Sequence, residues 1–213
     1  MRVPNEVQLA QPWRIHAVVA DFTLEDVWTL PLVGGGPDDF ATVIEMAAEF
    51  DPAKAESLPV RLLWGLRDRL GAWFAMGRIS VPVSEPAEPA DAAERLPIPG
   101  THECSLARRL PADLSGTADD VRFQHLPFVP LYRTADEFAA EISNRTVHGV
   151  MHLAWVDRGD GKHQGQMAVY VKPRGRLGEA YMAFIKPFRY AIVYPALERQ
   201  IECAWRQRSH RFG

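Results

Sequence analysis

The chain has 213 residues, of which 47% are hydrophobic, and its formal net charge at pH 7 is −3. This length and apolar content suit a single domain with a core of its own. The small negative charge and a pI near 6.2 argue against a general nucleic-acid-binding surface. No run approaches the ~18 consecutive apolar residues of a membrane span, and the N-terminus lacks the features of a signal peptide. We therefore expect a cytoplasmic protein with no membrane span and no nucleic-acid partner.

The two cysteines, Cys104 and Cys203, lie far apart in the sequence and match neither a metal-ligand spacing nor a redox CxxC pair. Neither has a sequence context that marks a nucleophile. We therefore expect free thiols in a reducing compartment, no metal site and no cofactor.

The N-terminal part of the chain is predicted to hold one strand and one short helix. Residues 1–12 indicate an irregular arm, whereas 13–20 (WRIHAVVA) suit a first strand. Asp21 or Thr23 can then cap a helix over 24–30, because a short polar side chain at that position accepts from the first free backbone N–H groups.

The middle of the chain combines apolar helical segments with a proline-rich insert. The glycine run 34–36 matches neither a phosphate-binding loop nor a dinucleotide fingerprint, so a flexible connector is the favoured interpretation. Helices are predicted over 38–50 and 58–76, and the second is apolar enough to line a cavity or an oligomer contact. Residues 80–120 predict a Pro-rich loop insert within one domain that spans 1–213.

Short runs rich in Val, Met and aromatic residues predict a series of antiparallel strands in the second half. The first, 125–133, contains prolines and is therefore placed at a sheet edge. Ala and Glu in 137–143 favour helix, but the segment leads directly into 146–156, so a strand is the preferred interpretation. The Asp-Gly pair in the turn 157–161 favours a hairpin with 165–173.

Alternation along 146–156 separates its side chains into two faces. One face, which is apolar and expected to look inward, consists of Val147, Gly149, Met151, Leu153 and Trp155. The other face carries Thr146, His148, Val150, His152, Ala154 and Val156. A bulge at Gly149 would re-aim the residues beside it.

Apolar residues recur three or four positions apart from about Leu177 to Trp205 and predict one long C-terminal helix across the sheet. Pro187 and Pro195 interrupt this stripe and predict a kink or a break near each. The predicted fold is therefore α+β, with a first strand, helices, antiparallel strands and a C-terminal helix in that order. This order is the helix-grip plan, in which a curved antiparallel sheet wraps a long C-terminal helix.

Several stretches carry a resemblance to a known family. Residues 144–156, 165–173 and 180–195, with 12–16 and 24–28 near the start, resemble a bacterial domain family of unknown function. That family occurs alone and C-terminal to short-chain-reductase-like modules. The resemblance implies a START or Bet v 1-like helix-grip fold, often with a hydrophobic ligand cavity, and no particular activity. Because no nucleotide-binding module is fused to this chain, any reductase would be a separate partner.

Candidate chemistry rests on two histidines and three nearby acids. On a strand, the rings of His148 and His152 would lie about 13 Å apart, too far to share one metal ion. They either hydrogen-bond within the sheet or line one end of a pocket. Asp136, Glu137 and Glu141 could supply a general base, but nothing in the sequence pairs one of them with a histidine.

The first functional hypothesis is a binding protein that holds a small hydrophobic or amphipathic molecule between the sheet and the C-terminal helix. The predicted ligand-binding residues are Tyr132, His148, Met151, His152, Trp155, Met167, Tyr170, Tyr181, Phe184 and Phe188. One strand cannot send Met151 and His152 to the same side unless a bulge or the cavity rim intervenes.

Two alternatives stay open, because one fold hosts many functions. The second hypothesis is an enzyme on the same fold, a cyclase, dehydratase or hydrolase of an aromatic or polyketide-like substrate. A histidine, a tyrosine and an acid that converge inside the cavity would favour it. The third is a module that forms a homodimer through 58–76. No catalytic motif is present, so the sequence does not decide whether the protein is an enzyme.

Overall fold

A computed structural model describes most of the N-terminal quarter, the sheet and parts of the C-terminal segment. The described residues are 1–51, 105–143, 147–176, 178–179, 182–183, 198–199 and 201–207. The predicted helix over 58–76, the proposed dimer contact on it and the insert before residue 105 lie outside these ranges.

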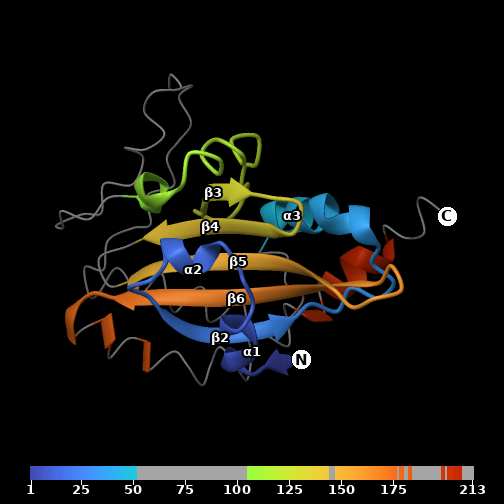
Figure 1. Cartoon of the computed structure of the whole chain (residues 1–213), viewed down its shortest axis with the longest axis horizontal. Helices are drawn as coiled ribbons and strands as arrows, with labels where there is room; N and C mark the ends of the chain where they lie inside the picture. Colours follow the sequence, from blue (N-terminus) through green and yellow to red (C-terminus); the bar gives the residue numbers. More distant parts are fainter. Residues whose placement is uncertain are drawn as a thin grey trace.

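Six antiparallel strands form one curved sheet in the order β1-β2-β6-β5-β4-β3 (Figure 1). The strands are β1 Arg2–Val3, β2 Thr23–Thr29, β3 Val129–Arg133, β4 Glu137–Ser143, β5 Val147–Asp157 and β6 His163–Pro173. The last four follow one another along the chain as neighbours in the sheet, and β2 then pairs with β6. With the helices described below, this sheet makes the protein an α+β fold.

The structure confirms the strands predicted for the second half of the chain. Residues 137–143 form β4, and β3 lies at the edge of the sheet, as its prolines predicted. The turn between β5 and β6 contains Gly159, Asp160 and Gly161, all at positive φ. This conformation suits glycine and is tolerated by aspartate. The pairing of β5 with β6 runs without a register shift, so Gly149 does not form a bulge.

The first-strand prediction for 13–20 is wrong, because this segment contains the short helix α2, Ile15–Val18. Ile15, Val18 and Val19 are all buried. Their spacing of three and four residues places them on one side of a helical turn, which packs down onto the sheet. The arm before it is also ordered, with β1 followed by α1, Asn5–Leu9.

The helix prediction for 24–30 is also wrong, because Thr23–Thr29 form β2. The cap chemistry of Asp21 and Thr23 is local, whereas pairing with β6 supplies backbone hydrogen bonds along the whole segment. A register shift between Leu24 and Asp26 breaks the alternation that would have marked a strand. Long-range pairing therefore overrides the local helix signal.

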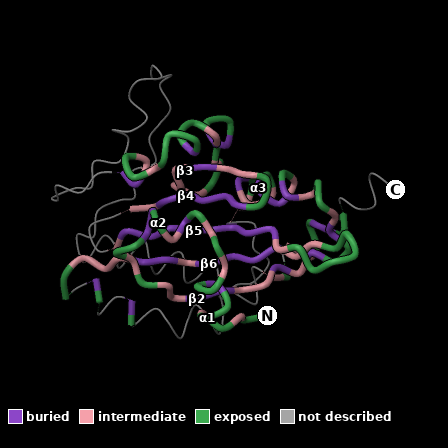
Figure 2. Tube along the Cα trace, viewed as in Figure 1, coloured by how far each residue is buried: buried purple, intermediate pink, exposed green. Residues whose placement is uncertain are grey.

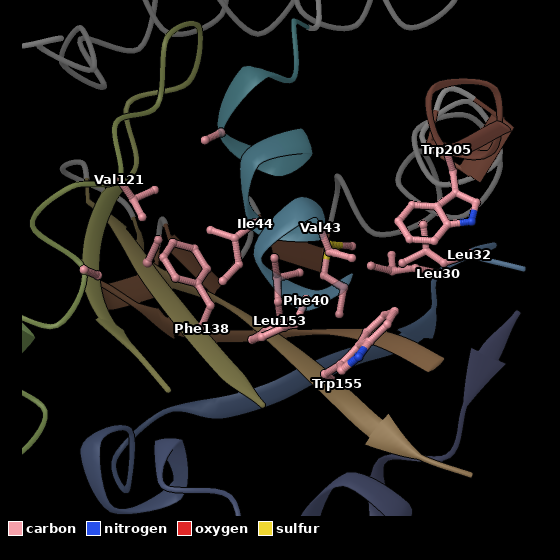
Figure 3. Packing of buried hydrophobic residues seen from close by; sticks show 14 residues of the cluster. Leu30, Leu32, Phe40, Val43, Ile44, Val121, Phe138, Leu153, Trp155 and Trp205 are labelled. Carbon is pink, nitrogen blue, oxygen red and sulfur yellow. The ribbon is translucent and has the colours of Figure 1, made fainter. Parts of the chain in front are cut away.

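One face of the sheet, the α3 face, packs against α3, Phe40–Glu49, which follows the 3-10 turn η1, Pro37–Asp39. The predicted helix over 38–50 is thus confirmed. Figure 3 shows how α3 lies over the strands. The buried cluster here consists of Leu30, Leu32, Phe40, Val43, Ile44, Ala48, Ala118, Val121, Phe138, Ala140, Leu153, Trp155, Met167 and Trp205.

The opposite face, the α1–α2 face, is covered by the N-terminal helices and by the turn η4, Leu106–Arg109. Figure 1 shows α1 and α2 lying across it. Its cluster consists of Ile15, Val18, Val19, Val27, Leu106, Leu114, Leu131, Tyr132, Ala139, Val150, Ala168 and Tyr170. The expectation that only one face of β5 looks inward is therefore wrong, and the central strands are buried along most of their length (Figure 2).

The glycine run 34–36 is a packing element and not a flexible connector. Gly35 is buried, and a Cβ placed on it would lie 2.7 Å from the Trp155 ring. The Trp155 indole donates to the Gly36 carbonyl at 2.9 Å, and the His163 N–H donates to the Gly35 carbonyl at 2.9 Å. Glycine is needed at Gly35 because the ring and the backbone are in close contact.

The C-terminal segment is helical wherever it is described, at 175–176, 178–179, 182–183, 198–199 and 201–207. One long C-terminal helix is not seen, and the predicted kinks at Pro187 and Pro195 lie outside the described residues. Trp205 packs into the cluster on the α3 face, and Ile201 packs against it. None of the described helices is long and apolar enough to cross a membrane.

Candidate functional site

The sheet divides the predicted ligand-binding residues between its two faces. Met151, Trp155 and Met167 face α3. The other group, Tyr132, His148, His152 and Tyr170, lies on the α1–α2 face. Tyr181, Phe184 and Phe188 lie outside the described residues. The polar members of the predicted site therefore lie together on one face of the sheet, and the described apolar members lie on the opposite face.

The strand pair β4–β5 places a glutamate beside each histidine on the α1–α2 face. His152 lies opposite Ala139, one diagonal step from Glu137. Its Nε2 lies 3.1 Å from Oε2 of that glutamate, and both side chains are buried. His148 takes the same diagonal to Glu141, with 2.8 Å between Nε2 and Oε2. The sheet register thus builds two matching histidine–glutamate pairs.

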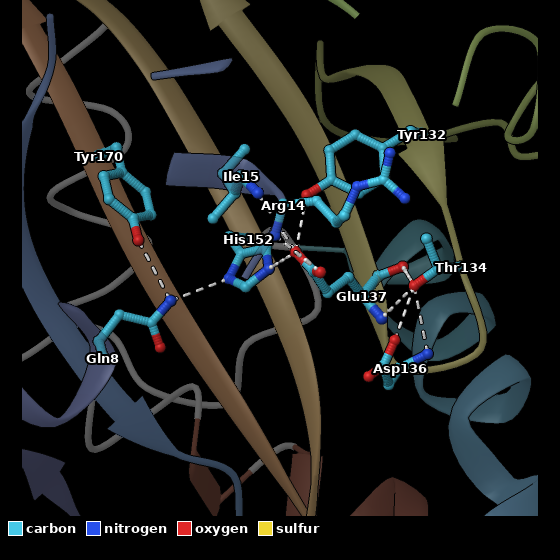
Figure 4. A network of polar contacts seen from close by, with 9 residues as sticks. All are labelled: Gln8, Arg14, Ile15, Tyr132, Thr134, Asp136, Glu137, His152 and Tyr170. Carbon is cyan, nitrogen blue, oxygen red and sulfur yellow. Dashed lines mark hydrogen bonds and ion pairs between the residues drawn. The ribbon is translucent and has the colours of Figure 1, made fainter. Parts of the chain in front are cut away.

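The Glu137 carboxylate collects hydrogen bonds from three elements (Figure 4). It accepts from the Tyr132 hydroxyl at 2.9 Å and from the backbone N–H groups of Arg14 at 2.9 Å and Ile15 at 3.3 Å. Burial raises the pKa of this carboxyl, but the hydrogen bonds from His152, the Arg14 backbone and Tyr132 lower the pKa more in sum. Glu137 is therefore ionised at neutral pH, because its pKa lies below the ordinary value.

Glu141 has a corresponding role at η4. It accepts from the Leu106 N–H at 3.1 Å and from the Ser105 hydroxyl, which in turn caps η4 by accepting from the Ala107 N–H. Because Ser105 donates to the glutamate and not to His148, this group is not arranged as a nucleophile–base pair. The second pair therefore anchors a covering segment, and the first pair is the better functional candidate.

The second ring nitrogen of His152 faces the N-terminal arm. The Gln8 amide nitrogen lies 3.2 Å from His152 Nδ1 and 3.1 Å from the Tyr170 hydroxyl. With the amide in this orientation, Nδ1 accepts, and Nε2 carries the proton that is donated to Glu137. Burial raises the pKa of Tyr170 to about 12, so its hydroxyl is protonated and can donate.

Three buried polar atoms around this histidine have no hydrogen-bond partner. They are Gln8 Oε1, Trp13 Nε1 and His16 Nε2. The Trp13 ring centroid lies 5.9 Å from that of His152, and the His16 ring centroid lies 6.4 Å from that of Tyr170. A buried polar atom without a partner costs about 1–3 kcal/mol. Three such atoms belong to side chains that lie close to the His152–Tyr170 pair.

Sequence reasoning missed Gln8 because residues 1–12 were expected to be an irregular arm, and it missed Trp13 and His16 because 13–20 was expected to be a strand. It named Glu137 and Glu141 but found no histidine for either. A usable signal did exist: the two glutamates are four residues apart on one strand, and the two histidines are four apart on the next. A hairpin between such strands brings the pairs together on one face.

Within the described ranges, no three His, Cys, Asp or Glu side chains gather closely enough to hold a metal ion. The described site offers hydrogen-bonding side chains and a histidine held by a carboxylate.

No curated protein and no solved structure matches the chain. One protein family does match it, the family described as "Protein of unknown function (DUF2867)", over residues 18–196. The match covers most of the 213 residues, including α3 and all strands except β1. Gln8, Trp13 and His16 lie before the matched region. The chain is therefore a member of the DUF2867 family.

Proposed function

We propose that the protein binds a small hydrophobic or amphipathic molecule whose polar end meets the α1–α2 face of the sheet. The single observation that carries this proposal is the group of unpartnered polar atoms on Gln8, Trp13 and His16 around His152 and Tyr170. A bound polar group would remove the cost of burying these atoms. The apolar side chains beside them would surround the rest of the molecule.

The architecture behind this proposal is a helix-grip plan of the START and Bet v 1 kind. The curved antiparallel sheet supports it, as do the helical residues that follow β6. Residues 201–207 pack on the α3 face through Trp205. For this reason the proposal places the polar end of the ligand on the opposite face and not between the sheet and 201–207.

Native mass spectrometry of the purified protein tests the binding role. The proposal expects a mass excess that disappears on denaturation, and a small molecule in the solvent extract of the denatured sample. A Gln8→Leu variant should carry less of that molecule than the wild type. Glu6→Gln, an exposed change on the same helix, is the matched control. A protein that carries no small molecule and takes up none from lipid and metabolite extracts would contradict the proposal.

A second candidate is acid–base catalysis on the same bound molecule. The observation that favours it is the convergence of a histidine, a tyrosine and an acid, His152, Tyr132 and Glu137. The carboxylate fixes the imidazole through Nε2, which leaves Nδ1 as the base toward the ligand side. Gln8, which occupies Nδ1 here, would then have to move when the substrate binds.

The two candidate functions can be distinguished by comparing the small molecules that co-purify with the wild type and with the His152→Gln variant. If the protein is an enzyme, His152→Gln should hold an unreacted substrate whose mass differs from that of the molecule extracted from the wild type. If it is a binding protein alone, the same compound should come from both. A cytoplasmic location, a homodimer through 58–76 and a separate reductase partner remain predictions from the sequence and its family resemblance.

A further inference from the structure

The unpartnered atoms on the α1–α2 face have complementary hydrogen-bonding roles. Trp13 Nε1 only donates, and Gln8 Oε1 only accepts. Burial and the neighbouring His152 lower the pKa of His16, so its ring is neutral at neutral pH and its Nε2 either donates or accepts. A single group that bonds to both Trp13 Nε1 and Gln8 Oε1 must therefore both donate and accept.

The neighbouring His152 sets the orientation of the Gln8 amide. In the described orientation its nitrogen serves His152 and Tyr170, and Oε1 has no partner. Turning the amide over would place its oxygen against the Nδ1 lone pair of His152, which is unfavourable in the tautomer that donates Nε2–H to Glu137. Gln8 is fully buried, so Oε1 requires a partner of its own.

Charge disfavours an anion at this place. Glu137 is ionised and bonded to His152, and it would repel a second negative group in a buried setting. Arg14 donates its backbone N–H to this glutamate but turns its guanidinium away to Asp113, at 2.6 Å on the surface. Among the described residues, no Lys or Arg side chain bonds to the Gln8–His152–Tyr170 network.

We propose that the site formed by Gln8, Trp13, His16, His152 and Tyr170 takes an uncharged hydroxyl group, so that the ligand is an alcohol with an apolar body. This inference rests on the proposed binding function and names its ligand class. The ligand hydroxyl accepts from Trp13 Nε1–H and donates to Gln8 Oε1. An ether only accepts, and a carboxylate adds a charge, so neither matches the site.

The test compares four small probes of similar size on the full chain, freed of any co-purified molecule: octan-1-ol, its isomer 1-methoxyheptane, octanoate and octylammonium. Binding is followed at neutral pH in ¹H–¹⁵N spectra, with the Trp13 indole N–H as the local reporter. We expect octan-1-ol to bind at least about tenfold more tightly than each of the other probes, since a lost or unmatched hydrogen bond has about that effect. The Trp13 indole N–H signal should shift when octan-1-ol binds.

Two variants locate the preference. Gln8→Leu and Trp13→Phe should each reduce the advantage of the alcohol over its ether isomer to less than about threefold. The exposed change Glu6→Gln should leave the advantage unchanged. If Gln8→Leu does not fold, Trp13→Phe decides, because its ring still fills the same space.

The outcomes separate the two proposals. If no probe binds, the binding function itself is overturned. If octanoate, octylammonium or the ether binds as tightly as the alcohol, binding stands and the hydroxyl inference is overturned. If both variants still prefer octan-1-ol to its ether isomer as strongly as the wild type does, the hydroxyl binds elsewhere. The proposed site would then be wrong.

Discussion

Glu137 connects more parts of the molecule than any other described carboxylate on the α1–α2 face. Its two oxygens accept hydrogen bonds from β3, from the start of α2 and from the histidine of β5. A buried carboxylate is tolerated only when such partners compensate for the lost water. It thus orients His152 and also fixes the covering helix α2.

Replacing Glu137 with glutamine is expected to lower the free energy of unfolding by about 3 kcal/mol. The amide keeps the shape of the side chain but presents one NH₂ group to partners that are themselves donors. Urea unfolding measures the loss. The neighbouring exposed Asp136→Asn should cost about 0.5 kcal/mol or less, and an equal cost for the two variants would show that Glu137 has no such role.

The same carboxylate predicts a dependence of stability on pH. The folded-state pKa of Glu137 lies below its ordinary value of 4.5, so folding favours the ionised form. Its contribution is complete above that ordinary value and is lost as the pH falls through the folded pKa. Melting temperatures from about pH 7 to about pH 3 should therefore fall more steeply for the wild type than for Glu137→Gln. Parallel curves would contradict the lowered pKa.

At the scale of elements, the two histidine–glutamate pairs hold the covering segments on the sheet. Each glutamate accepts from the backbone at the start of a helical turn, α2 in one case and η4 in the other. The pairs use the same diagonal of one hairpin. The two glutamates on this face therefore hold α2 and η4 on the sheet. The proposed site lies beside them, where polar atoms of Gln8, Trp13 and His16 have no partner.

The sequence predicted the elements whose signals are local and missed those that depend on distant pairing. The Asp160–Gly161 turn and the strands on either side of it carry their own signals. In contrast, β2 depends on β6, which lies far along the chain, and its cap-like residues pointed to a helix. Of the polar residues on the α1–α2 face, His148, His152, Tyr132 and Tyr170 could be named, but Gln8 comes from an arm without periodicity.

The packing of the glycine loop on β5 gives an element-scale prediction. Gly35→Ala would place its Cβ 2.7 Å from the Trp155 ring, so the ring must move and its hydrogen bond to Gly36 is weakened. We expect a loss of about 1–3 kcal/mol in the free energy of unfolding. Gly36→Ala is the matched control, because its Cβ would meet its nearest contact, Asp39, at 3.6 Å. Thermal melting of both variants measures the difference, and equal melting temperatures would contradict the close contact.

At the scale of the whole molecule, the sheet is covered on both faces by different parts of the chain. The α3 face holds an apolar cluster completed by Trp205, whereas the α1–α2 face combines apolar residues with the buried polar network. The two faces therefore differ in chemistry: the first supplies stability, and the second supplies the polar groups that the proposed function uses.

This division predicts different effects on the two faces. Trp205 is 7% exposed and donates its indole N–H to the Val33 carbonyl at 2.9 Å. Trp205→Ala should lower the free energy of unfolding by about 3–5 kcal/mol. The variant should nevertheless retain the ligand preference in whatever fraction stays folded, as measured by the Trp13 indole signal. The exposed Arg206→Ala is the control. If both changes lower the free energy of unfolding by the same small amount, residues 201–207 do not belong to the core.

The most direct test of the central claim is a high-resolution crystal structure of the purified protein, examined at Gln8, Trp13 and His16. The account predicts electron density for a non-protein molecule, with a polar atom within about 3 Å of Trp13 Nε1 and of the Gln8 amide, and with an apolar body beside the α1–α2 face. If those atoms instead hydrogen-bond to the chain itself or to isolated waters alone, the claim that they form a ligand site is contradicted.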